Sequence, residues 1–345
     1  MNPQPIILTG EYGTSTVWVG ERIGNLAEHL PSGSVFAITD ENLYRHYPEP
    51  FKDIPVFVLK PGEQSKTIAS IEEICRWLMD QGAGRDAFIL GVGGGVVCDI
   101  AGFAASVFMR GVAFGFVATS LLGQVDGCIG GKNGVNLDGY KNIIGNFSQP
   151  RFVICDTRML HTLPEVEFRN GLAEVIKHAL IADGEMFDYI RKHHDDILRL
   201  KPEAINYLVK RSVEIKAAIV SADEREQGER RKLNLGHTWG HAVEKTDGIP
   251  HGQAVSIGLE FAAALSVKKD LLSHNDREEI AGLLKKFRLP VKTQTPNREI
   301  FEALQKDKKK ENDYLYFILM DGIGKVRVEP VTLSELLSFI CQQGT

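Results

Sequence analysis

Short, almost continuous apolar runs alternate with helical patterns in the first half of the chain. The predicted strands are Val35–Thr39, Val56–Leu59, Phe88–Gly91, Phe114–Ala118 and Phe152–Cys155, and predicted helices between them include Ile68–Asp80 and Val97–Phe108. Strands of this kind are typical of a parallel sheet that helices cover on both faces. The alternation predicts a doubly wound α/β domain, in which ligands bind beyond the carboxyl ends of the strands.

From about Leu163 onwards, amphipathic helical patterns dominate. They predict helices at Asn170–Ile181, Gly184–Leu198, Pro202–Asp223, Leu235–Lys245, Gly252–Lys268, Asn275–Phe287 and Leu333–Gln342, and a hairpin of Tyr314–Met320 with Lys325–Glu329. A chain of 345 residues exceeds one typical core. We therefore expect two domains, an α/β nucleotide-binding domain at residues 1–160 and a mainly α-helical domain at residues 161–345.

The composition narrows the class of protein. Apolar residues make up 43% of the chain and charged residues 25%, as in soluble globular proteins. The formal net charge of −5 predicts no broad basic surface, which disfavours nucleic acid as a partner. No apolar run approaches the roughly 20 residues that span a bilayer, and the first residues lack the pattern of a signal peptide. We therefore expect a cytoplasmic protein without a membrane partner.

The cysteines point away from structural cross-links. The chain has 5 of them, an odd number, and no pair has CxxC spacing. This pattern predicts neither a disulfide framework nor a zinc knuckle.

A glycine-rich turn, Gly91–Gly95, connects a predicted strand to a predicted helix. Its spacing is GxGGG, which differs from the GxGxxG fingerprint. A tight turn without a ligand is the simplest interpretation. Its position at a helix N-terminus nevertheless favours a dinucleotide site, because freed backbone N–H groups can hold a pyrophosphate. Asp99, one turn into the helix, is then an acidic partner or a charge in the cap region.

A second glycine-rich stretch, Gly130–Asn136, contains Lys132 and resembles a phosphate loop. No GxxxxGK[ST] frame is present, which disfavours an ATPase. Glycines let the backbone approach a ligand closely, and a lysine supplies a mobile positive charge. Lys141 and Asn142 follow nine residues on. The two stretches together predict a nucleotide and a phosphorylated substrate that meet at one place.

Candidate metal ligands lie in the second half. Glu174 and Lys177 are three residues apart on a predicted helix and therefore share a face. His237 and His241 lie one turn apart at the start of another helix, and His251 starts a third. One carboxylate and two imidazoles are a common catalytic zinc set with positions left open for substrate oxygens. Spacing alone favours His237 with His241 and leaves His237 with His251 open.

A charged run, Asp223–Lys232, precedes the histidine helix. Such runs are typical of solvated loops. Its position next to His237 makes Arg230 the candidate for binding a carboxylate. Lys216 lies late in the predicted helix before this run.

These segments resemble 3-dehydroquinate synthases, of the sugar-phosphate cyclase family. The resemblance rests on PGEQSKT, GGGVVCDIAGFAASVFMRG, ATSLLGQVDGCIGGKNGVN, YKNIIGNFSQP, GLAEVIKHALI, LNLGHTWGHAVE and HGQAVSIG, in this order between about Gly62 and Gly324. It implies a phosphate-eliminating lyase of the shikimate pathway of aromatic amino acid biosynthesis, which converts 3-deoxy-D-arabino-heptulosonate 7-phosphate to 3-dehydroquinate and phosphate. The implied steps are transient oxidation by NAD, phosphate elimination, reduction, ring opening and aldol closure.

The resemblance also implies cofactors and an assembly. One NAD+ and one divalent metal, zinc or cobalt, would bind to a homodimer, with the site in the cleft between the NAD-binding domain and the metal- and substrate-binding domain. The metal ligands would be Glu174, His237 and His251, which makes His241 either a residue behind the ligands or a substrate residue. Asp126 would lie near the nicotinamide, and Arg110 would reach the phosphate, across a dimer interface.

Two larger sets complete the implied site. The residues implied for NAD are Asp40, Asn42, Pro61, Gly62, Glu63, Gln64, Ser65, Lys66, Gly94, Gly95, Val96, Val97, Cys98, Asp99, Thr119, Ser120, Asp126, Lys132, Lys141 and Thr162. The residues implied for substrate are Lys132, Asn142, Lys177, Lys216, Arg230, Asn234, His241, Arg110 and Lys308.

The chain departs from the usual residues of the family at three places. Cys98 stands where glycine is common, Asn133 where threonine is common, and Gly127-Cys128 where small serines are common. Metal-dependent polyol dehydrogenases, which share the general fold, are the alternative enzyme class, but they need fewer phosphate-binding cations. A binding protein without chemistry would not need the full set of candidate ligands. We therefore expect the synthase.

Overall fold

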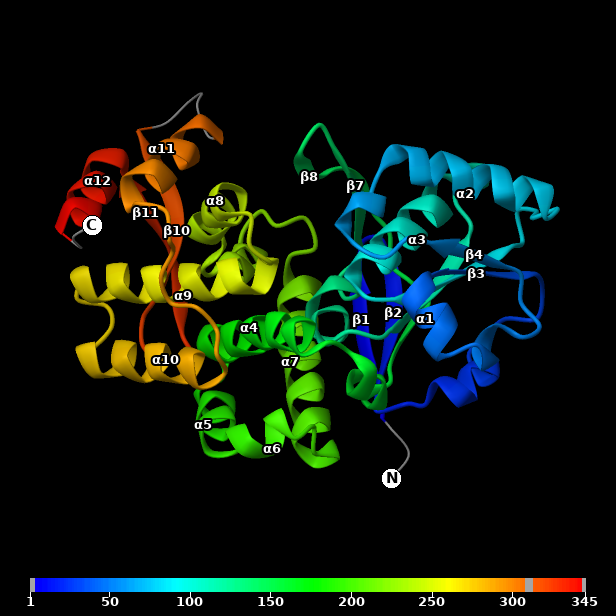
Figure 1. Cartoon of the computed structure of the whole chain (residues 1–345), viewed down its shortest axis with the longest axis horizontal. Helices are drawn as coiled ribbons and strands as arrows, with labels where there is room; N and C mark the ends of the chain where they lie inside the picture. The colour runs from blue at the N-terminus through cyan, green and yellow to red at the C-terminus, as the bar shows by residue number, and fades with distance from the viewer. Residues whose placement is uncertain (1–3, 308–312, 343–345) are drawn as a thin grey trace. The chain divides into compact units, whose positions relative to one another are not determined.

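The computed structural model describes residues 4–307 and 313–342 (Figure 1). The chain divides into two compact units: unit 1 comprises Met1–Phe168 and Ile205–Glu224, and unit 2 comprises Arg169–Ala204 and Arg225–Thr345. Most of helix α7 (Pro202–Ala222) thus belongs to unit 1. The expected single boundary near residue 160 places this helix in the second domain instead. Within the described residues, no helix has the length and apolar character that crossing a membrane requires.

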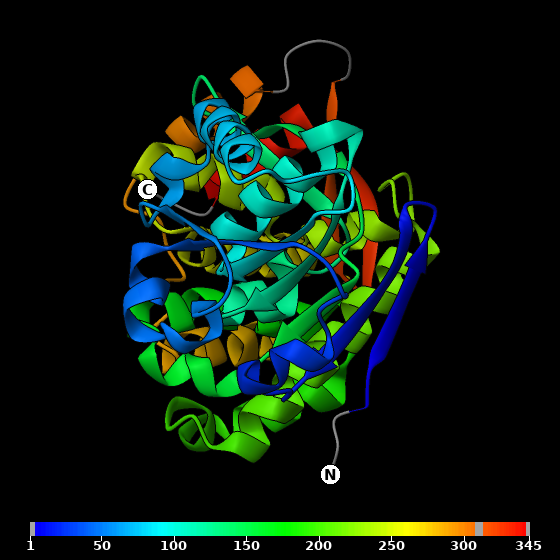
Figure 2. The same cartoon turned by 90° about the vertical axis from the view of Figure 1, so that its right-hand side faces the viewer.

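A seven-stranded sheet in the order β1-β2-β9-β6-β5-β3-β4 forms the centre of unit 1. Its strands are β1 (Ile6–Gly10), β2 (Gly13–Val19), β3 (Val35–Asp40), β4 (Val56–Leu59), β5 (Phe88–Gly93), β6 (Ala113–Ala118) and β9 (Phe152–Cys155). All neighbouring strands pair in parallel except β1 and β2, which are antiparallel. The five predicted strands are confirmed. The β1–β2 hairpin, seen in Figure 2, was not predicted, because threonine, serine and glycine interrupt its apolar residues.

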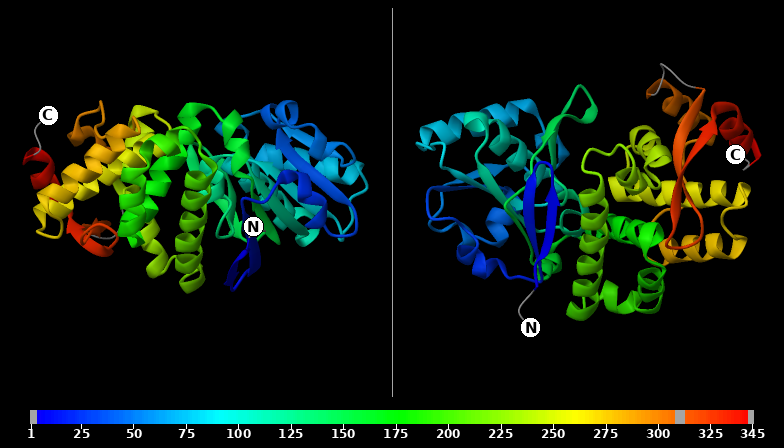
Figure 3. Two further views of the ribbon diagram at one scale, coloured as in Figure 1. Left: turned by 90° about the horizontal axis from the view of Figure 1, so that it is seen from below. Right: turned by 180° about the vertical axis from the view of Figure 1, so that it is seen from behind.

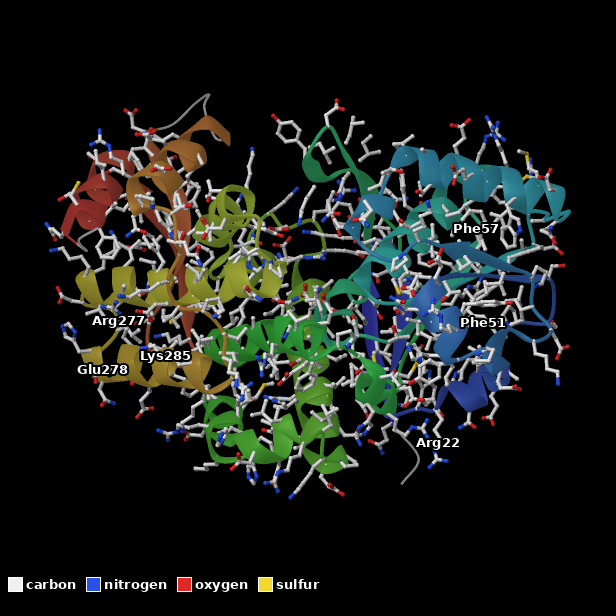
Figure 4. The ribbon with its side chains drawn as sticks, in the orientation of Figure 1. Arg22, Phe51, Phe57, Arg277, Glu278 and Lys285 are labelled. Atoms are coloured by element: carbon white, nitrogen blue, oxygen red, sulfur yellow. The ribbon has the colours of Figure 1, made fainter. Side chains whose placement is uncertain are left out.

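Helices cover both faces of this sheet, as in a doubly wound domain. The helices are α1 (Glu41–His46), α2 (Ile68–Asp80) and α3 (Gly95–Val107). Phe51 packs with α1 into the core cluster on one face. On the other face Trp77 of α2 contacts Phe57 of β4, with ring centroids 5.6 Å apart; Phe51 and Phe57 are labelled in Figure 4. The predicted fold class of the N-terminal half is confirmed.

Strands β7 (Lys132–Leu137) and β8 (Tyr140–Phe147) form a separate antiparallel hairpin in unit 1. Its turn is Asp138-Gly139, with φ angles of 49° and 80°. A two-residue Asp-Gly loop with positive φ is a strong hairpin signal. The predicted loop conformation of Gly130–Asn136 is therefore wrong, because the chain forms a β-strand from Lys132 onwards.

Unit 2 consists mainly of helices, as predicted. They are α4 (Glu165–Ala182), α5 (Gly184–Lys192), α6 (His194–Leu198), α8 (His237–Asp247), α9 (His251–Lys268), α10 (His274–Lys286), α11 (Asn297–Asp307) and α12 (Leu333–Gln342). The hairpin of β10 (Tyr314–Met320) and β11 (Val326–Thr332) packs along α9 (Figure 3). The single helix predicted at Gly184–Leu198 is wrong, because the chain breaks there into α5 and α6. Helix α11 was not predicted.

The core of unit 2 joins α8 to α9. Trp239 of α8 stacks on Phe261 of α9, with ring centroids 3.9 Å apart. Arg277 of α10, labelled in Figure 4, donates from Nε to Glu260 Oε1 of α9 at 2.9 Å. Together these contacts fix α9 between its neighbours.

Two glycines of α9 allow unusually close helix packing. A Cβ added to Gly258 would lie 1.9 Å from the carbonyl oxygen of Gly236, just before α8. A Cβ added to Gly252 would lie 2.3 Å from the carbonyl oxygen of Asn170 in α4. Only glycine fits at such contacts. The start of α9 is thereby held against both α8 and α4.

Candidate functional site

Three helices of unit 2 bring a carboxylate and two imidazoles together. Glu174 lies in the middle of α4 and is fully buried, and His237 and His251 are the first residues of α8 and α9. Glu174 Oε1 lies 3.3 Å from His251 Nε2 and 3.6 Å from His237 Nε2. One ligand atom from each of the three residues lies within 4.8 Å of the others. This donor set suits a zinc-type divalent metal.

The ionisable side chains of the cluster strongly shift one another's pKa values. Lys177 Nζ pairs with Glu174 Oε2, and both side chains are buried. Burial raises the pKa of Glu174. Lys177 and the two histidines lower it by more than burial raises it, so that it lies well below its usual range. Burial and the charge of Lys177 lower the pKa of His237 to about 3. Burial also lowers the pKa of His251, but its contacts with Glu174 and Glu244 raise it to about 9.

His237 provides a further test of the fit. Its Nδ1 lies 3.2 Å from the carbonyl oxygen of Leu235, so the proton of the neutral ring belongs on Nδ1. The lone pair of Nε2 then faces the Glu174 carboxylate, and two acceptors are opposed without a proton between them. A cation between these atoms removes the conflict, so the residues present fit a metal.

His241 belongs to a different group of donors. It is exposed, and it shares a second possible ligand set with Glu244 and His251. The rings of His237 and His241 are 5.1 Å apart, close to the 5.4 Å that separates those of His237 and His251. Glu174 faces His237 and His251, however, and the spacing of His237 and His241 alone does not reveal this.

Two more of the residues implied for substrate lie on the 3-10 turn Glu229–Asn234 of unit 2. Arg230 is 3% exposed, and Asn234 Nδ2 donates to Glu226 Oε1. The neighbouring Arg231 places its guanidinium 5.8 Å from the ring centre of Tyr316 in β10, which attaches this turn to the hairpin. Lys308 lies outside the described residues.

In unit 1, the residues implied for NAD follow the carboxyl ends of the parallel strands. Asp40 ends β3 and caps α1, where its Oδ1 accepts from the N–H groups of Asn42 and Leu43 at 2.9 Å. Thr162 follows β9, and its Oγ1 lies 2.8 Å from the hydroxyl of Tyr47. This edge of the sheet is where doubly wound domains bind nucleotides.

The glycine turn between β5 and α3 lies at the same edge. Gly94 is the N-cap residue of α3, and no side chain caps this helix within the described part of the chain. The Thr119 N–H donates to the Gly93 carbonyl at 2.9 Å, and a Cβ at Gly94 would lie 3.0 Å from Ser120 Oγ. A helix N-terminus without a side-chain cap is a position where an anion can bind.

A network of polar side chains fastens the Pro61–Lys66 loop to the β7–β8 hairpin. Lys66 Nζ donates to Asp99 Oδ2 and to Asn142 Oδ1, both at 2.5 Å. Asn136 donates from Nδ2 to Glu63 Oε1 at 2.8 Å and accepts from the Asn142 N–H at 2.8 Å. Asn136 was missed in the sequence, although it ends the GGKNGVN segment. Lys132 and Lys141 of the hairpin are exposed.

Asp99 allows a direct test of this network. Burial raises its pKa to about 6, although Lys66 lowers it. We expect Lys66→Met to raise the pKa of Asp99 above 6, because the ammonium no longer offsets burial. Carboxyl-carbon NMR titration measures this, with Lys66→Arg as the control that keeps a positive charge. An unchanged pKa in Lys66→Met would mean that Lys66 does not act on Asp99.

Two further candidates lie on unusual turns of unit 1. Asp126 lies in the turn Gly123–Gly127, and Lys216 Nζ of α7 donates to its Oδ1 at 2.5 Å and to its carbonyl oxygen at 2.6 Å. Arg110 is exposed and follows Met109, and these two residues have φ angles of 70° and 51°. Consecutive left-handed residues other than glycine are strained, and such strain concentrates at binding sites.

The chain is similar to known proteins over nearly its whole length. The family model described as 3-dehydroquinate synthase N-terminal matches residues 56–170, and the model described as 3-dehydroquinate synthase C-terminal matches residues 171–310. A 3-dehydroquinate synthase of Caldanaerobacter subterraneus subsp. tengcongensis is 41% identical over 333 residues, which are 93% of this chain and 94% of the relative.

Solved structures of related cyclases share the fold. A 2-deoxy-scyllo-inosose synthase complexed with carbaglucose-6-phosphate, NAD+ and Co2+ has a TM-score of 0.85 at 27% identity, over 98% of this chain and 100% of that chain. A 2-epi-5-epi-valiolone synthase of Streptomyces hygroscopicus subsp. jinggangensis with NAD+ and Zn2+ bound has a TM-score of 0.85 at 27% identity, over 95% of each chain.

Proposed function

Because the chain belongs to the 3-dehydroquinate synthase family, we propose a role in that reaction for each group of its candidate residues. The enzyme is an NAD- and divalent-metal-dependent lyase that converts 3-deoxy-D-arabino-heptulosonate 7-phosphate to 3-dehydroquinate and phosphate. The predicted family and activity are thus confirmed. The single observation that carries the residue assignment is the cluster of Glu174, His237 and His251.

Glu174, His237 and His251 would hold the metal. The glycine turn before α3, the Pro61–Lys66 loop and Asp40 would hold the NAD. When bound, NAD+ accepts a hydride and later returns it, while the metal polarises the hydroxyl group that is oxidised. The opposed acceptors of Glu174 and His237 and the uncapped N-terminus of α3 support these assignments.

Buried cations of unit 2 would hold the substrate. Arg230 can bind its carboxylate through two parallel hydrogen bonds, and its burial strengthens that contact. Lys177 lies against the metal ligand Glu174, so its ammonium would contact a substrate oxygen next to the metal. Asn234 and His241 would bind hydroxyl groups.

The cations of the hairpin and of the strained turn in unit 1 would bind the phosphate. Lys132, Asn142 and Arg110 are exposed and have the hydrogen-bond donors that phosphate oxygens need. The leaving phosphate can itself accept the neighbouring C–H proton, so these residues need only hold one conformer for elimination and later ring closure. Lys216, held by Asp126, would orient the reacting ring.

We extend the proposal to the assembly and its location. The enzyme would be a cytoplasmic homodimer, with Arg110 placed at the interface by its exposed, strained turn. Sedimentation equilibrium of the purified chain tests the dimer. A monomer with full activity would contradict it.

The reaction predicts a distinct product balance. With the heptulosonate phosphate, Co2+ or Zn2+ and catalytic NAD+, we expect phosphate release far in excess of NAD+, with no net NADH. NADH that accumulates with the product would indicate a dehydrogenase instead, and no product would indicate a binding protein. A hexose 6-phosphate is the comparison substrate, because the 27% identical inosose synthase was solved with carbaglucose-6-phosphate. Faster turnover of that sugar would favour a related cyclase.

A further inference from the structure

His251 contacts a carboxylate through each of its ring nitrogens. Its Nε2 lies 3.3 Å from Glu174 Oε1, and its Nδ1 lies 3.3 Å from Glu244 Oε2. Glu244 is on α8, and its side chain is only 9% exposed. Neither the sequence motifs nor the proposed function gives Glu244 a role.

The connection between α8 and α9 produces this contact. Helix α8 ends at Asp247, and the C-cap residue Gly248 has a left-handed φ of 64° and donates its N–H to the Glu244 carbonyl at 3.1 Å. Pro250 then caps α9, whose first residue is His251. Glu244 therefore lies in the last turn of one helix and faces a ligand at the start of the next. The two residues are seven positions apart in sequence, so an HxxxH pattern does not reveal the pair.

The two histidines of the cluster have the same orientation but different supports. Each directs Nε2 toward Glu174 Oε1 and Nδ1 toward a second acceptor. For His237 that acceptor is the neutral carbonyl of Leu235, at 3.2 Å; for His251 it is the carboxylate of Glu244. A carboxylate behind a ligating histidine fixes its tautomer and ring orientation and increases its basicity.

We propose that Glu244 is a positioning residue that holds His251 with Nδ1–H toward itself and Nε2 toward the metal, and thereby raises the affinity of the site for a divalent metal. This inference rests on the metal assignment proposed above. It also decides between two ligand sets, because Glu244 could otherwise be a ligand together with His241 and His251. The opposed acceptors of Glu174 and His237 require a cation on the Nε2 side of the rings, which leaves Glu244 behind His251.

Metal affinity of the full-length enzyme tests the proposal, measured by chelator competition with Zn2+ and Co2+. We expect Glu244→Ala to weaken binding by about 10–100-fold, as for other partners behind metal ligands. Glu244→Gln should lose less, but still a measurable several-fold, because its amide oxygen accepts from Nδ1–H without increasing the basicity of the ring. With saturating metal, kcat should largely recover in both variants, and the visible spectrum of bound Co2+ should show an unchanged number of ligands.

Glu278→Ala is the matched control, since Glu278 is exposed on α10 of the same unit (Figure 4). Unchanged metal affinity in Glu244→Ala would overturn the proposal. A changed Co2+ spectrum together with an affinity as low as that of His251→Ala would also overturn it, because that result would make Glu244 a ligand. If Glu244→Ala does not fold, Glu244→Gln decides, and no loss of affinity there overturns it. A Glu174→Gln variant with wild-type affinity would instead refute the metal assignment itself.

Discussion

Replacement of Glu174 by glutamine is expected to abolish stoichiometric metal binding and to lower kcat/KM by about three orders of magnitude, since a polarising metal supplies several kcal/mol of transition-state stabilisation. The amide keeps the shape of the side chain but removes its negative charge. The oxygen nearest to both histidines then becomes a poor ligand, and Lys177 is left as a buried ammonium without its partner. Metal content of the purified variant and steady-state phosphate release measure both effects.

The loss of a buried charge can also destabilise the fold, so controls must separate the two effects. Removing one partner of a buried ion pair costs about 3–5 kcal/mol. The double variant Glu174→Gln with Lys177→Met removes both charges and should recover stability without recovering metal. Glu185→Gln, at an exposed position in the first turn of α5, should change neither stability nor metal binding. Full metal content and full turnover in Glu174→Gln would show that Glu174 is not a ligand.

Much of unit 1 could be predicted because its signals are local. The parallel strands are continuous apolar runs, and each candidate NAD residue after a strand end follows from the strand assignment and the rule for doubly wound sheets. The β7–β8 hairpin was missed although its Asp138-Gly139 turn is also a local signal. The glycines and Lys132 before it drew the interpretation toward a phosphate loop.

The metal cluster was harder to predict than the NAD residues, because its three members lie on three different helices. The spacing of His237 and His241 is visible within one helix, and it favours the wrong neighbour for Glu174. What places His251 beside Glu174 is the reversal at Gly248 and the packing of α9 on α4. Only the resemblance to a family suggested the set that the structure brings together. Asn136 and Glu244 had no signal of their own, because Glu63 is distant from Asn136 in sequence and Glu244 meets His251 only through the turn between α8 and α9.

The close packing of α9 predicts a second large effect, a difference in stability between two glycine-to-alanine substitutions at different sites. We expect Gly258→Ala to destabilise the protein by about 3 kcal/mol, at the upper end of overpacking costs, because its Cβ would lie 1.9 Å from the Gly236 carbonyl oxygen. Gly282→Ala in α10 has nothing within 4 Å of its Cβ. It should stabilise by about 0.5–1 kcal/mol, through the higher helix propensity of alanine. Midpoints of urea unfolding measure both changes.

Metal affinity shows whether this packing also serves the site. The Gly236 carbonyl lies directly before His237, so a shift of α9 at Gly258 moves the first turn of α8 relative to His251. Gly258→Ala should therefore weaken metal binding as well as stability, whereas Gly282→Ala should leave affinity unchanged. Lower stability with unchanged affinity would mean that α8 and α9 hold the two histidines independently of the Gly236–Gly258 contact. Equal effects of the two substitutions on stability would mean that the backbone absorbs the added methyl group without loss.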